Sequence, residues 1–132
     1  LIYNIKANAS VIEGPSAGAV MAVATIAAIK DKKIKPGVFM TGAVSESGEV
    51  MPVSGIPEKS AAAKNSGAKL FLIPAANYVQ SFEKQKSCAK YNVLEYCEII
   101  FKPIEGDISR ALGIEVKEVK NINEAVNYFL EQ

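Results

Sequence analysis

The chain has 132 residues, of which 49% are hydrophobic and 22% charged, a composition typical of one globular domain that can bury a core. Fifteen basic and 14 acidic residues give a net charge of +1, which argues against a uniformly basic nucleic-acid-binding surface. The sequence contains no histidine, so Ser-His-Asp and Cys-His catalysis and every His-ligated metal site are excluded within this chain.

Gly, Pro and Lys residues divide the first half of the chain into alternating strands and helices. Residues 2–12 are rich in β-branched side chains and predict a strand. Pro15 begins an Ala-, Met- and Ile-rich segment that predicts a buried helix up to Lys30. The elements expected next are a buried strand at 38–44, a turn at 46–49, a returning strand at 50–53, a helix at 57–66 and a strand at 69–73.

The second half continues the alternation and sets the predicted fold class. Strands that alternate with helices, together with one hairpin, predict a compact α/β (α+β) domain over residues 1–132 with a mixed sheet and flanking helices. The expected elements are a helix at 76–90, a strand at 97–102, a short helix at 105–112, a strand at 114–119 and an amphipathic helix at 122–131.

The cysteines and the ends of the chain suggest no special chemistry. Cys88 and Cys97 are nine positions apart, which matches neither a disulfide framework nor a zinc site, so we expect two partly buried apolar side chains and no metal. The longest nearly apolar stretch, 17–29, is shorter than the roughly 20 residues that span a bilayer. No signal peptide is visible. The chain opens on Leu1, within a predicted strand, so we expect it to be part of a longer protein.

Ser16 is the first candidate for chemistry. It follows a Gly-Pro pair and lies in the first turn of a predicted buried helix. The backbone around Pro15, Ser16 and Ala17 lies where free N–H groups of a helix start can bind an oxyanion or a phosphate. The alternative is that Ser16 only caps the helix, as most serines at such positions do.

A nucleophilic serine needs a base, and without histidine the candidates are a lysine or a carboxylate. A lysine amine serves only when neutral, and burial or the positive end of a helix favours that form. Lys59 lies in the first turn of the second predicted helix, before a run of small residues. The alternative is a solvated lysine. Thr41, in the middle of a predicted strand, either orients this amine or bonds a backbone carbonyl.

Four segments taken together resemble the proteolytic domain of Lon proteases. They are EGPSAG at 13–18, MTG at 40–42, GEVMPV at 48–53 and GIPEKS at 55–60. The candidate serine and lysine are 43 positions apart, and the order of strand, hairpin and helix between them matches the family pattern. The similarity covers about residues 10–76, and the strand and helix that close the chain also look like those of the family. Ser54 departs from it, because it replaces the first glycine of the usual Gly-Gly pair.

The resemblance implies a peptidase with a Ser-Lys dyad. Ser16 is then the nucleophile, Lys59 the general base and later acid, and Thr41 a hydroxyl that helps to hold the lysine amine. Glu13 matches an acidic position of archaeal-type members that contacts the lysine. The resemblance also implies that residues 77–113 form an insertion, which we read either as a subunit-interface or substrate-gating element or, as the preferred alternative, as an extra helix and strand packed on the core.

For the longer protein, the resemblance implies ATP-dependent proteolysis in protein quality control. Its substrates are then unfolded polypeptides, the assembly a hexameric ring and the location cytoplasmic, with an anchor outside this chain as the alternative. No cofactor is implied for this domain, since ATP belongs to an AAA+ module, and the Walker A pattern GxxxxGK[ST] is absent from this sequence.

Two other functions stay open at this stage. One is a catalytically silent Lon-like domain with a structural or interaction role. The other is a phosphate-binding domain of the GHMP kinase class, because a Gly-containing turn before a helix is a generic anion site. The turn at 13–18 is short for that class and leaves Lys59 unexplained.

Overall fold

A computed structural model describes residues 2–7, 14–75, 77, 81–104, 109 and 113–132. Its centre is a parallel sheet in the order β1-β4-β7, made of β1 (Val38–Met40), β4 (Leu70–Pro74) and β7 (Glu115–Val119). The strands are in register at Phe39 and Phe71 and at Phe71 and Val116. The predicted α/β class is confirmed, and no helix among these residues is long and apolar enough to cross a bilayer.

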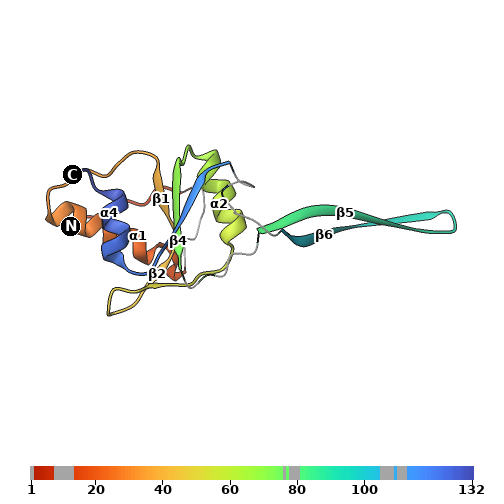
Figure 1. Ribbon diagram of the computed structural model, residues 1–132, viewed down its shortest axis with the longest axis horizontal. Helices are drawn as coiled ribbons and strands as arrows, with labels where there is room; N and C mark the ends of the chain where they lie inside the picture. The colour runs from red at the N-terminus through yellow and green to blue at the C-terminus, as the bar shows by residue number, and fades with distance from the viewer. Residues whose placement is uncertain (1, 8–13, 76, 78–80, 105–108, 110–112) are drawn as a thin grey trace.

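The sheet lies between two helical layers, as Figure 1 shows. Helices α1 (Gly18–Ile29) and α4 (Ile122–Phe129) cover one face, and α2 (Ile56–Asn65) covers the other. Successive side chains of β4 alternate between these layers because a strand has a period of two. Leu72 packs with α1 and α4, whereas Phe71 and Ile73 pack with α2. We call this three-layer part, with the hairpin of β2 (Ala43–Val44) and β3 (Val50–Met51), the body.

The segment after β4 leaves the body as a long two-stranded ribbon. Strands β5 (Ser81–Tyr91) and β6 (Leu94–Ile104) pair with each other along 11 residues and project away from the sheet (Figure 1). Each described side chain between residues 86 and 99 is exposed. We call this hairpin the arm.

The arm corrects three predictions made from the sequence. The helix expected at 76–90 is wrong, because cross-strand pairing overrides the helix propensity of the Glu, Lys and Gln residues there. The strand expected at 97–102 is present within β6, but the expected packing of an extra helix and strand on the core is wrong for residues 81–104, which lie outside the body. Cys88 and Cys97 are not partly buried apolar side chains, because they are exposed partners in a disulfide.

Other elements agree with the prediction, with two further corrections. The helices expected from Pro15 and at 57–66, the strand at 69–73 and the last strand and helix are present within a few residues. The strand expected at 38–44 is broken at Thr41 and Gly42 into β1 and β2. The described residues 2–7 form no strand, and the remainder of that prediction lies outside the described residues, as does most of the expected helix at 105–112.

Candidate active site

Ser16 is held at the start of the longest helix of the body. It lies in the 3-10 turn η1 (Pro15–Ala17), which runs directly into α1. Two backbone hydrogen bonds join this turn to the break between β1 and β2: Gly42 N–H donates to the Ser16 carbonyl at 2.9 Å, and Ala19 N–H donates to the Gly42 carbonyl at 3.0 Å. The position of Ser16 is therefore tied to the end of β1.

Glycine is required at position 42 by packing. A Cβ atom built there lies 2.7 Å from Val50 Cγ1 and 3.4 Å from the Ala19 side chain. Val50 is buried in the core cluster that contains α1. A side chain at position 42 would therefore push apart the contact that holds η1 and α1 against β1.

Thr41 follows the last residue of β1 and is 5% exposed. Its N–H donates to the Leu72 carbonyl at 3.1 Å, which prolongs the pairing with β4. Its hydroxyl Oγ1 donates to the Ser16 carbonyl at 3.4 Å. This is the backbone bond that the sequence left open as one alternative, and orientation of the Lys59 amine by Thr41 stays a prediction.

Lys59 extends from the second turn of α2. Its amine Nζ donates to the carbonyl oxygen of Ser54 at 2.8 Å. The segment that carries this carbonyl is fixed by Asn77, whose Oδ1 accepts from Val53 N–H at 3.0 Å and whose Nδ2 donates to the Val53 carbonyl at 2.6 Å. Sequence reasoning missed Asn77, because no spacing links a lone asparagine after β4 to a loop 24 residues upstream.

The predicted serine, threonine and lysine meet at one hollow of about 330 Å³. Thr41 places it beyond the carboxyl end of β1, which is where open α/β sheets bind ligands. Most of its wall is apolar or made of small side chains, as expected for a substrate site with few polar groups. The lining residues are Ser16, Ala17, Val20, Phe39, Met40, Thr41, Lys59, Ala62, Ala63, Ser66 and Phe71.

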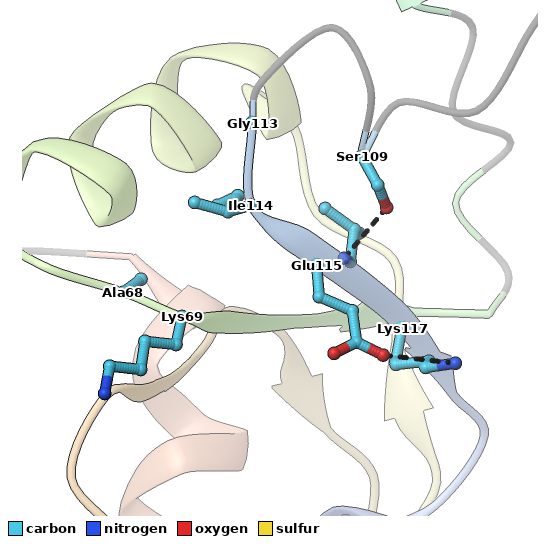
Figure 2. Close-up of a pocket in the computed structure, with 8 residues that line it drawn as sticks. Ala68, Lys69, Ser109, Gly113, Ile114, Glu115 and Lys117 are labelled. Carbon is cyan, nitrogen blue, oxygen red and sulfur yellow. Dashed lines mark hydrogen bonds and ion pairs between the residues drawn. The ribbon is translucent and has the colours of Figure 1, made fainter.

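A larger hollow of about 640 Å³ lies elsewhere (Figure 2). Lys69, Gly113 and Ile114 place it at the amino ends of β4 and β7, the opposite edge of the sheet from Thr41. Two pairs of its polar groups are engaged with each other: Ser109 Oγ accepts from Val116 N–H at 3.0 Å, and Lys117 pairs with Glu115 at 3.4 Å. Since Ser16, Thr41 and Lys59 line the smaller hollow and none of these three lines the larger one, we place the candidate active site at the smaller hollow.

The backbone around Ser16 sets which groups can stabilise an oxyanion. Pro15 has no N–H and cannot donate, so it drops out of the predicted set for a chemical reason. The N–H groups of Gly18 and Ala19 donate to the carbonyls of Pro15 and Gly42. The N–H groups of Ser16 and Ala17 are therefore the candidate donors. Glu13, the remaining predicted residue, lies outside the described residues.

A family model described as "Lon protease (S16) C-terminal proteolytic domain" matches residues 4–99. The chain belongs to the Lon protease family. Lon protease of Lachnoclostridium phytofermentans is 46% identical over 74 residues, 56% of this chain and 9% of the relative. Lon protease of Phenylobacterium zucineum is 40% identical over 110 residues, 83% of this chain and 14% of the relative. The mitochondrial Lon protease homolog of Kluyveromyces lactis is 32% identical over 120 residues, 87% of this chain and 11% of the relative.

These matches identify a Lon proteolytic domain and set its extent. The chain spans about a tenth of the length of the curated relatives named above. The resemblance to the Lon proteolytic domain that the sequence motifs indicated is therefore confirmed.

Proposed function

We propose that this domain hydrolyses peptide bonds with Ser16 as nucleophile and Lys59 as general base. The observation that carries the proposal is that Ser16, Thr41 and Lys59 line one hollow although they come from η1, the break after β1 and α2. Its lining residues include a serine with a hydroxyl, a lysine with an amine, and Ser16 and Ala17 as the candidate N–H donors, which together are the groups that acyl transfer needs.

The proposed reaction begins with a movement of the lysine side chain. The amine leaves the Ser54 carbonyl and accepts the proton of Ser16 Oγ, which attacks the carbonyl carbon of the substrate. The N–H groups of Ser16 and Ala17 stabilise the oxyanion. Lys59 then protonates the leaving amine, and a water molecule activated by the same lysine hydrolyses the acyl-enzyme. Thr41 supports this arrangement through its bond to the Ser16 carbonyl.

The serine is tested with a fluorophosphonate probe, which labels only an activated serine. We expect wild type to be labelled, Ser16→Ala to lose the label, and Ser66→Ala, which alters a serine of the same hollow, to keep it. Equal labelling of Ser16→Ala would contradict the assignment. An unlabelled wild type would instead support the catalytically silent alternative.

The lysine is tested by its ability to lose a proton. Lys59→Arg keeps a positive charge but replaces the amine with a guanidinium that does not deprotonate in proteins. We expect this variant to lose cleavage of a fluorogenic peptide, whereas Lys64→Arg in the last turn of the same helix keeps it. Wild-type cleavage by Lys59→Arg would assign the base to another group.

The wider setting follows from the family and belongs to the same proposal. Unfolded polypeptides are the proposed substrates, a hexameric ring the proposed assembly, and an AAA+ module outside this chain the proposed user of ATP. Glu13 as a contact of Lys59 and residues 77–113 as an insertion remain predictions. A cytoplasmic location also remains a prediction. The exposed disulfide between Cys88 and Cys97 is a feature of oxidising compartments, so thiol trapping in cells, which reports whether these cysteines are reduced, tests that location.

A further inference from the structure

The arm has two strand edges that pair with nothing in the described part of the chain. Strands β5 and β6 form a two-stranded sheet of their own. A two-stranded hairpin alone is marginally stable in water, and independent stability needs a third strand or a packed face. Unpaired edges are also templates for pairing with another chain. The arm therefore presents a surface that another strand can complete.

The register shows which backbone groups point outward from this ribbon. Tyr91 and Leu94 flank a two-residue turn, which makes them a pair that exchanges backbone hydrogen bonds. Along the ladder from there, hydrogen-bonded and non-hydrogen-bonded pairs alternate. In this alternation Cys88 and Cys97 are a pair without backbone hydrogen bonds between them. Their Cα atoms are 4.1 Å apart, which agrees with the short spacing of non-hydrogen-bonded pairs. The outward N–H and C=O groups of the described distal half belong to Lys86, Cys88 and Lys90 on β5 and to Glu95, Cys97 and Ile99 on β6.

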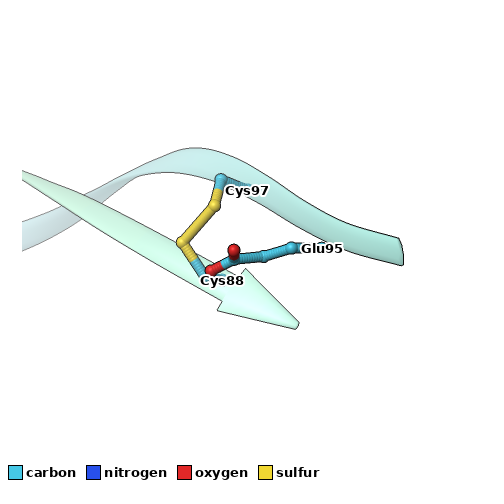
Figure 3. A group of neighbouring side chains, drawn as sticks. All are labelled: Cys88, Glu95 and Cys97. Atoms are coloured by element: carbon cyan, nitrogen blue, oxygen red, sulfur yellow. A yellow bond between two sulfur atoms is a disulfide. The ribbon is translucent and has the colours of Figure 1, made fainter. Parts of the chain in front are cut away.

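The disulfide keeps this arrangement in place. Cys88 and Cys97 are joined across the ladder, with Glu95 on the same face (Figure 3). Slippage by one residue would move every side chain to the opposite face, and a covalent bond between directly opposed residues prevents it. Since both sulfurs are used in this bond, they are not thiolate ligands for a metal ion in this form.

The two edges carry opposite charges. Between residues 86 and 91, β5 has Lys86 and Lys90 and no acidic residue, whereas β6 between 94 and 99 has Glu95 and Glu98 and no basic residue. Lys90 and Glu95 are opposite each other in the ladder. They form no ion pair, because the ion pair found among the described residues is the one between Lys117 and Glu115. Charge therefore favours β5 beside β6 and disfavours β5 beside β5 or β6 beside β6.

The apolar face of the arm fits the same arrangement. Tyr91, Leu94 and Tyr96 lie on the face opposite the disulfide and are 79%, 73% and 63% exposed. A second ribbon added edge to edge would extend this face, so that aromatic and aliphatic side chains of neighbouring strands pack against each other. An 11-residue edge is about 36 Å long.

We propose that the arm binds a second copy of this chain, with the outer edge of β5 in one copy pairing antiparallel with the outer edge of β6 in the next. This contact goes beyond the peptidase chemistry and does not depend on it. It is heterologous, so each contact leaves one free edge of each kind, and assembly proceeds until the copies close on themselves. The arm is then a subunit-joining element built from backbone hydrogen bonds and complementary charge.

The first experiment measures mass by analytical ultracentrifugation over a range of concentrations. Wild type should associate. Lys86→Glu/Lys90→Glu makes both edges acidic and should associate less than wild type, and Glu95→Lys/Glu98→Lys makes both basic and should also associate less. The fourfold variant that combines them swaps the edges, keeps the wild-type net charge and should associate again. Lys32→Glu/Lys33→Glu changes two exposed lysines of the body and should associate as wild type does.

The second experiment identifies the contact itself. A carbodiimide joins lysine amines to carboxylates in contact, and an equal mixture of light and ¹⁵N-labelled protein separates links between copies from links within one arm. We expect mixed-label links between Lys86 or Lys90 and Glu95 or Glu98. A monomeric wild type, unchanged association of the two reversed variants, or mixed-label links confined to the body would each overturn the proposal. So would an arm that links only to added reduced, carboxymethylated α-lactalbumin, which would identify an unfolded chain as the partner.

Discussion

The body and the arm are held together by different forces. In the body, the side chains of β4 are buried between two helical layers, and Leu72 and Ile73 are almost completely removed from water. In the arm, an equally regular pair of strands has its described side chains exposed and a disulfide across its distal half. The body is stabilised by the burial of apolar side chains, whereas the arm is held by the register of its strand pairing and by the disulfide. Changes to side chains should therefore act on the body, and changes to pairing or cross-linking should act on the arm.

The largest expected difference between the two regions is in catalysis. Ser16→Ala should reduce hydrolysis of a fluorogenic peptide by about 10³-fold or more, because the proposed nucleophile is lost while the fold remains. Ser87→Ala, which alters an exposed serine of the arm, should leave the rate unchanged. The measurement is kcat/KM for both variants beside wild type. A comparable loss in Ser87→Ala would show that the arm takes part in the reaction.

The next difference is in stability, and two leucines provide a matched pair. Leu72 is 0% exposed in the body and Leu94 is 73% exposed in the arm. Leu72→Ala should lower the free energy of unfolding by about 2–5 kcal/mol, from lost burial and the cavity that remains. Leu94→Ala should change it by less than about 0.5 kcal/mol. Urea unfolding followed by circular dichroism at low protein concentration measures both, and equal effects would contradict the division into body and arm.

A smaller effect is expected where the body holds the candidate nucleophile. Gly42→Ala places a Cβ against Val50 Cγ1 and should cost about 1–3 kcal/mol of stability together with part of the activity. Gly42→Ala/Val50→Ala removes the clashing atom and should recover part of both losses, beyond what addition of the single effects gives. Val50→Ala alone is the control. Simple additivity of the two changes would show that the contact with Val50 is not what limits position 42.

Sequence patterns predicted the body well because its elements follow from local chemistry. The apolar segment after Pro15 forms α1 as expected, although its burial is limited to Ala19, Val23 and Ala27. The glycines and prolines marked the ends of the strands and of α2. Four short motifs also identified the family, which the match over residues 4–99 confirms. The break of a continuous apolar run at Thr41 and Gly42 was not predictable, since it depends on the contact of Gly42 with Val50.

The arm was not predictable for a related reason. Its sequence is rich in residues that suit helices, and the pairing that makes it a ribbon joins positions up to 23 residues apart, such as Ser81 and Ile104. In the site, Ser16 and Lys59 were found because their types and positions are unusual, whereas the role of Asn77 depends on a hydrogen-bonded pair with Val53 that no local pattern encodes. Candidate residues could thus be singled out from the sequence, but the contacts around them required the fold.

The smallest expected effect on the whole protein comes from reduction of the disulfide, and it should be confined to the arm. The bond closes a short loop, so its loss mainly frees the local ribbon, and the body shares no core side chain with the described part of it. Reduction with dithiothreitol, or Cys88→Ser/Cys97→Ser, should speed chymotryptic cleavage at Tyr91 and Tyr96 several-fold without moving the urea midpoint of the body. Because register then depends on hydrogen bonds alone, the same treatment should weaken association between copies. A shifted midpoint would mean that the arm and the body unfold as one unit.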